Sequence, residues 1–140
     1  MIENTLFLVE GVSVYTGSDN TVRVWNLQKK RQEFVLKGHT GCVKSLAIAH
    51  DNKYVVSGSD NNTVIVWNLQ ERRIEAVLEG HAKSISITYD NKYVIYSGFD
   101  KTVTVWNLQK KFQEAVLYKT DSENIWIKKY PEIDPLIKLI

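Results

Sequence analysis

The side chains with the most potential for chemistry are Cys42 and two histidines that each follow a glycine, His39 and His81. Cys42 stands three residues after His39, and such a pair could supply a nucleophile and its base. The matching residue is absent near His81, however, and a lone cysteine at the start of a strand is usually a small core residue. No acidic or cysteine cluster accompanies the histidines to complete a metal site. We therefore expect no catalytic residue, no metal and no cofactor.

A second candidate is electrostatic, because three equivalent turns each carry adjacent cations. These residues are Lys29, Lys30, Arg31, Arg72, Arg73, Lys110 and Lys111. Together they could line one rim of the molecule and attract phosphate or an acidic partner. Glutamates close by offset part of this charge, and the turns carry no aromatic platform for stacking bases. Solvated turns are the favoured interpretation. Anion binding, to nucleic acid or phosphoinositide, is the alternative function.

The elements that must position these residues repeat along the chain. Residues 63–70 read Thr-Val-Ile-Val-Trp-Asn-Leu-Gln, and near-identical copies occupy 21–28 and 102–109. The tryptophans fall at 25, 67 and 106, so the steps are 42 and 39 residues. A fixed period of this size indicates a repeat architecture. Short β-branched and aromatic runs between turn residues predict an all-β fold with four strands in each of three units.

The predicted units cover about residues 5–36, 43–78 and 84–117, within a domain of residues 1–118. Residues 119–140 depart from the repeat and are predicted to form a C-terminal extension, with one strand at 124–129. Pro131 and Pro135 oppose a continuous helix or central strand there.

Composition narrows the class of protein further. The chain is 44% hydrophobic and 24% charged, as globular domains are, and its net charge of +2 is small. A single cysteine excludes an intramolecular disulfide. The N-terminus lacks the cations and the apolar run of a signal peptide, and no segment reaches the roughly 20 apolar residues of a membrane span. We expect a cytoplasmic protein, with the nucleus as the second location.

The spacing of two dipeptides points to a family. Gly38-His39 stands 28 residues before Trp67, and Gly80-His81 stands 25 residues before Trp106. This pattern resembles the WD-repeat β-propeller family, with Trp-Asn here in place of Trp-Asp. The resemblance implies three consecutive four-stranded antiparallel blades that form an incomplete or open ring. Rings in this family generally have seven or eight blades. Three blades cannot close such a ring, so one apolar face of the first blade and one of the last should be exposed. We expect a fragment or degenerate copy of a larger propeller, ahead of self-association through those faces or low stability.

The resemblance also implies a structural hydrogen-bond network in each unit, joining the histidine, a hydroxyl, an acidic position and the tryptophan. The matching residues are His39, Ser57, Asn61 and Trp67 in unit two, His81, Ser97, Asp100 and Trp106 in unit three, and Thr16, Asp19 and Trp25 in unit one. The acidic position of unit two is ambiguous, because strict spacing from Trp67 selects Asn61 while Asp60 stands one residue away. Gly41, Cys42 and Val43 of unit two have no counterpart in unit three, so the loop before its first strand is short. This shortening works against the third network.

Family members hold peptides and proteins on the rim formed by the Gly-His loops and the turns before the tryptophan strands. The residues matching that rim are Thr40, Ser59, Asp60, Ala82, Phe99 and Lys101. The expected function is a non-catalytic scaffold whose partners are other proteins or peptides. Nucleic acid is the less favoured partner.

Overall fold

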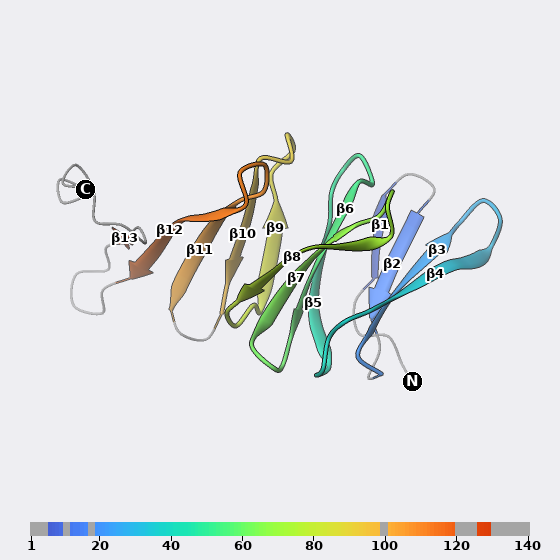
Figure 1. Ribbon diagram of the computed structural model, residues 1–140, viewed down its shortest axis with the longest axis horizontal. Helices are drawn as coiled ribbons and strands as arrows, with labels where there is room; N and C mark the ends of the chain where they lie inside the picture. The colour runs from blue at the N-terminus through green and yellow to red at the C-terminus, as the bar shows by residue number, and fades with distance from the viewer. Residues whose placement is uncertain (1–5, 10–11, 17–18, 99–100, 120–125, 130–140) are drawn as a thin grey trace.

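The computed structural model describes residues 6–9, 12–16, 19–98, 101–119 and 126–129, and these form three antiparallel β-sheets standing side by side (Figure 1). This arrangement confirms the predicted all-β fold of propeller-type blades in an open array. The described part of the chain contains no helix with the length and hydropathy that a membrane span needs.

Each sheet is built from strands consecutive in sequence. The first contains β1 (Leu6–Val9), β2 (Val12–Thr16), β3 (Thr21–Asn26) and β4 (Arg31–Lys37). The second contains β5 (Val43–Ile48), β6 (Tyr54–Ser59), β7 (Thr63–Asn68) and β8 (Arg73–Glu79). The third contains β9 (Ser84–Ile87), β10 (Tyr93–Ser97), β11 (Thr102–Asn107), β12 (Phe112–Lys119) and β13 (Trp126–Lys129). The third sheet therefore has five strands rather than four, because β13 pairs with the outer edge of β12.

The repeat is visible in backbone detail as well as in sequence. The pairing of each tryptophan strand with the next strand shifts at the same place, just before Trp25, Trp67 and Trp106. Such an irregularity bends a strand and increases its twist, so each tryptophan is presented in the same way. The turns repeat too: Asn20, Asn62 and Lys101 all have positive φ before a tryptophan strand, and Lys30, Arg72 and Lys111 have it after one.

The core lies between the sheets, and alternate residues of the middle sheet face its two neighbours. Val55, Ile65 and Trp67 pack toward the first sheet. Val56, Val64 and Val66 pack toward the third. Alternation of side chains along a strand makes this double burial possible. The middle blade is consequently buried on both faces.

The end blades each retain one open face. Trp25 is only half-buried, whereas its counterparts Trp67 and Trp106 are 2% and 5% exposed. In the third sheet Val103 and Val105 are likewise half-buried, although the equivalent valines of the middle sheet are fully buried. No further sheet of the described chain packs on either end, so the ring is open (Figure 1).

Candidate functional site

His39, Ser57 and Trp67 are brought together in the second blade. His39 lies in the loop before β5, Ser57 lies on β6 and Trp67 on β7. The Trp67 indole N–H donates to Ser57 Oγ at 2.8 Å, and Ser57 Oγ lies 2.6 Å from His39 Nε2. The His39 ring meets the Trp67 ring edge-on, with centroids 6.1 Å apart. All three side chains are buried, so each hydrogen bond replaces one that water would supply.

The donors in this network can all point the same way. Ser57 accepts from the indole, so its own O–H is available to donate to His39 Nε2. The histidine proton then lies on Nδ1, which is 3.3 Å from Thr63 Oγ1, and Thr63 donates to Asn61 Oδ1 at 2.7 Å. Asn61 in turn donates to Thr40. Asn61 therefore reaches the histidine through Thr63, a link that sequence spacing alone did not reveal.

This network keeps His39 neutral. Burial lowers the pKa of His39 from 6.5 to about 4, and the hydrogen bond with Ser57 only partly opposes that shift. An asparagine stands where the family pattern has an acid, so the network ends on a neutral amide and supplies no carboxylate to stabilise an imidazolium. The arrangement is suited to holding the loop in place rather than to proton transfer.

The first blade has an acid at the position of Asn61, but it has no histidine with which that acid could interact. Asp19 accepts from the backbone N–H and the hydroxyl of Thr21, and pairs with Arg23 at 2.5 Å. The Thr21 hydroxyl and Arg23 together lower the pKa of Asp19 to about 2. Thr16, predicted as the hydroxyl of this network, pairs with Val22, whereas the register equivalent of the Ser57–Ile65 pair is Tyr15 with Arg23. The assignment of Thr16 is therefore displaced by one residue, and its side chain lies outside the described residues.

In the third blade the predicted hydroxyl is displaced by one residue. Ser57 pairs with Ile65, and the equivalent pair in the third sheet is Tyr96 with Thr104; Ser97 pairs with Val103. A shift of one residue moves a side chain to the opposite face of a sheet. The assignment of Ser97 is therefore wrong. Asp100 lies outside the described residues.

Tyr96 stands at the strand position in the third blade that Ser57 holds in the second. Its ring packs against Gly80, and its hydroxyl donates to the Glu79 carbonyl at 3.1 Å. The side chain is 4% exposed, and neighbouring His81 is half-buried. The third blade thus secures its Gly-His loop with a tyrosine.

The predicted partner-binding residues divide into two groups. Thr40, Asp60 and Lys101 are exposed on the glycine-histidine rim, the edge made by the Gly-His loops and the turns before the tryptophan strands. Ser59 and Ala82 are each only 3% exposed, so their assignment as direct contacts is corrected. The Ala82 carbonyl accepts from Ser45 at 2.7 Å and thereby joins the second and third blades. Phe99 lies outside the described residues.

Ser59 and Ala82 line a hollow between the second and third blades. The hollow has a volume of about 270 Å³, and its remaining walls are Lys44, Asp60, His81 and Lys83. Lys44 and Lys83 are exposed and stand at equivalent positions. Each directly precedes a serine of the first strand of its sheet, β5 or β9. Sequence reasoning did not select these lysines, although the repeated Lys-Ser pair was a signal for them. The hollow carries two cations and one carboxylate.

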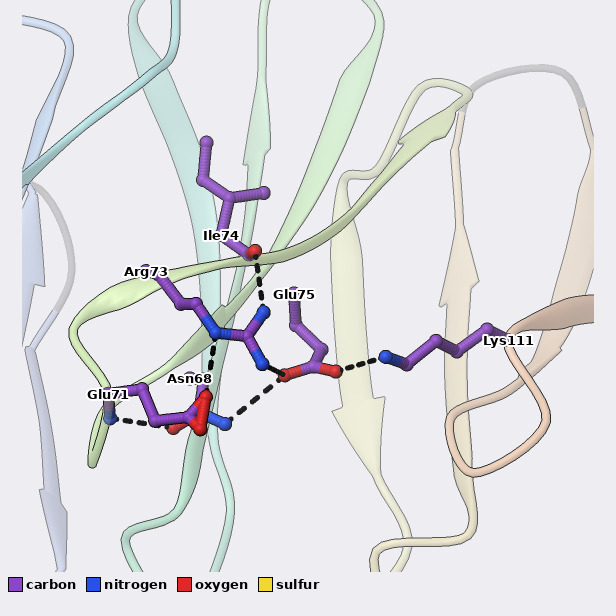
Figure 2. Close-up of polar contacts among 6 residues, drawn as sticks. All are labelled: Asn68, Glu71, Arg73, Ile74, Glu75 and Lys111. Atoms are coloured by element: carbon purple, nitrogen blue, oxygen red, sulfur yellow. Dashed lines mark hydrogen bonds and ion pairs between the residues drawn. The ribbon is translucent and has the colours of Figure 1, made fainter.

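The opposite rim, formed by the turns after the tryptophan strands, is more neutral than its lysines and arginines suggest. Arg73 bonds to Glu71 at 2.7 Å and lies 3.5 Å from Glu75, which also pairs with Lys111 (Figure 2). Arg72 lies over the Phe34 ring, 4.5 Å from its centroid. Three of the seven predicted cations are thus engaged within the protein, while Lys29, Lys30, Arg31 and Lys110 are exposed. These contacts weaken the case for anion binding.

Among the described residues, no group of three or more His, Cys, Asp or Glu side chains is placed to hold a metal ion.

Comparison with known proteins identifies the family. The family model described as "WD domain, G-beta repeat" matches residues 5–26, 30–68 and 72–107, which is more than half of the chain. The chain belongs to the WD40 family, whose members generally serve as non-enzymatic protein-interaction scaffolds. A search of curated proteins found no match.

Two solved structures show the likeness of fold. The structure of U3-55K matches with a TM-score of 0.76 and 20% identity, over 85% of this chain and 40% of that one. The crystal structure of the RRP9 WD40 repeats matches with a TM-score of 0.75 and 21% identity, over 83% of this chain and 38% of that one. This chain therefore spans about 40% of the length of these two structures.

Proposed function

We propose that this chain is a non-catalytic interaction module that binds an acidic segment of another protein in the hollow on the glycine-histidine rim. The observation that carries the proposal is the composition of that hollow, where Lys44 and Lys83 flank a floor of Ser59 and Ala82. Asp60 offsets one of the two cations and would set the register of a bound segment.

The size of the hollow favours a peptide side chain over a free small molecule. Ligand pockets usually enclose about 300–1,000 Å³, and this hollow is smaller and lies at the surface. One aspartate or glutamate of an extended peptide could reach between the lysines. Exposed ion pairs contribute only about 0–1 kcal/mol each, so the expected affinity is modest and falls with added salt.

The floor beneath the lysines is firmly held. Ser45 bonds to the Ala82 carbonyl across the two blades. A Cβ at Gly58 would come within 2.9 Å of the Ala82 side chain, so the blades are in close contact here. The two lysines therefore belong to a preorganised surface, which reduces the entropy lost on binding.

A displayed library of random 12-residue peptides tests the proposal. We expect selection on the purified chain to enrich sequences containing Asp or Glu. A selected peptide, labelled for fluorescence anisotropy, should lose at least tenfold in affinity for the Lys44→Glu, Lys83→Glu double variant.

Lys53→Glu is the matched control, because Lys53 is exposed in a turn on the opposite rim. It should leave binding unchanged. Enrichment of peptides without acidic residues, or equal binding by the double variant, would refute the proposal. Loss of binding only on neutralising Lys29, Lys30 and Arg31 would favour the opposite rim instead.

A further inference from the structure

A charge pair joins the second and third blades on the opposite rim, the edge formed by the turns after the tryptophan strands. Glu75 on β8 pairs with Lys111, which lies in the turn between β11 and β12 (Figure 2). The Glu75 side chain is only 7% exposed. Its other oxygen accepts from Asn68 at 3.1 Å within its own blade. The hydrogen bonds from Lys111 and Asn68 lower the pKa of Glu75.

The residues of this pair repeat in every blade. A glutamate stands eight residues after each tryptophan, at Glu33, Glu75 and Glu114, and a cation stands five residues after each, at Lys30, Arg72 and Lys111. Asn26 donates to Glu33 at 3.0 Å as Asn68 does to Glu75. At the junction of the first and second blades the cation, Arg72, lies over Phe34, the neighbour of Glu33. At both junctions, therefore, the cation reaches toward the β-strand that carries the glutamate of the preceding blade.

Within the described residues, no blade follows the one that carries Glu114 and no blade precedes the one that carries Lys30. The Glu114 Oε2 atom is buried and makes no hydrogen bond among the described residues. Lys30 is exposed on the first blade. A buried carboxylate oxygen without a partner is costly, and native proteins rarely leave one in place.

The open faces of the two end blades correspond to the two faces that are buried at each junction between consecutive blades. The outer face of the third sheet carries Ile95, Val103 and Val105, which correspond to the fully buried Val56, Val64 and Val66 of the middle sheet. The outer face of the first sheet carries Trp25, which corresponds to the buried Trp67. These are the two kinds of face that meet wherever consecutive blades of this chain pack.

We propose that a second copy of this chain covers these faces, head to tail, so that Lys30 of each copy pairs with Glu114 of the other as Lys111 pairs with Glu75. Contacts of this kind form closed rings when the rotation between copies permits. Two copies supply six blades, which lies within the four to eight typical of β-propellers as a class although below the seven or eight general in WD-repeat rings, whereas three copies would supply nine. The geometry therefore points to a closed dimer, independent of what the glycine-histidine rim binds.

Charge reversal tests the proposal, with mass measured by light scattering across a range of concentrations. The unaltered chain should be a dimer. Lys30→Glu and Glu114→Lys should each raise the dimer dissociation constant at least tenfold, because each places like charges at both junctions. Lys29→Glu, at the neighbouring exposed residue, should leave it unchanged.

Mixing the two destabilised variants provides the decisive arm. In a mixed dimer every junction again joins opposite charges, so an equimolar mixture of Lys30→Glu and Glu114→Lys should recover the dimer. A monomeric unaltered chain would overturn the proposal and indicate that blades of a longer protein cover these faces. A dimer insensitive to both reversals, or a mixture that stays monomeric, would overturn it equally.

Discussion

Replacing Ser57 with alanine tests whether the His39–Ser57–Trp67 network stabilises the second blade. Ser57 accepts a hydrogen bond from Trp67 at 2.8 Å and lies 2.6 Å from His39 Nε2. The substitution removes one oxygen and leaves two buried polar atoms without that partner. Each unsatisfied group costs about 1–3 kcal/mol, so we expect the free energy of unfolding to fall by about 2–4 kcal/mol. That loss is a large share of the ~5–15 kcal/mol typical of a domain.

Urea denaturation followed by tryptophan fluorescence and circular dichroism measures this loss. With a slope of about 1–3 kcal/mol per M, the midpoint should fall by about 1–2 M. Ser97→Ala is the matched control, because Ser97 is the serine that follows Tyr96 and lies on the other face of its strand. It should change the free energy of unfolding by about 0.5 kcal/mol or less. Equal losses in the two variants would refute both the role of Ser57 and the register assigned to the third blade.

Two further predictions concern the same loop. Stability should fall as the pH drops from about 6.5 to about 4, because His39 binds a proton in the unfolded chain while its folded pKa is about 4. This contribution to the free energy of unfolding is at most roughly 3 kcal/mol. The urea midpoints of the unaltered chain and of His39→Gln, measured across this pH range, should differ by an amount that depends on pH. A difference that does not change with pH would contradict the assignment. Gly38→Ala should cost about 1–3 kcal/mol, because a Cβ there would lie 2.9 Å from the Trp67 ring and 3.1 Å from Ile74. Thermal unfolding measures this loss, and a shift no larger than that of the exposed neighbour Lys37→Ala would contradict it.

The pattern of residues was sufficient for the architecture and for one network. The three Thr-Val-x-Val-Trp-Asn-Leu-Gln copies determine where the tryptophan strands lie, and local turn residues separate them from their neighbours. His39, Ser57 and Trp67 could be grouped because the second unit follows the family spacing throughout. The third unit could not be assigned in this way. Tyr96 and Ser97 are adjacent, and the family pattern, which has Ser or Thr at this position, selects Ser97. The strand register places Ser97 on the opposite face of the sheet from the network position.

Burial separated the exposed rim residues from those that form its floor. Ser59 ends β6 and Ala82 lies in a loop, both at positions typical of a binding rim, yet each is only 3% exposed, and Ala82 contacts Ser45 and lies close to Gly58 of the second blade. Those contacts join segments more than 20 residues apart, so no local pattern reports them. Lys44 and Lys83 became candidates only when the two blades were seen to enclose a common hollow.

The sequence by itself determined the repeat, the all-β blades and the identity of the packing residues, because these depend on local periodicity and turn chemistry. The tertiary structure decided which side chains of different blades meet. It paired Glu75 with Lys111, left Trp25 half-buried and left a Glu114 oxygen buried without a hydrogen bond among the described residues. The physical reason is that burial between blades and charge pairs between blades depend on how consecutive blades pack. The local sequence of one blade does not specify that packing.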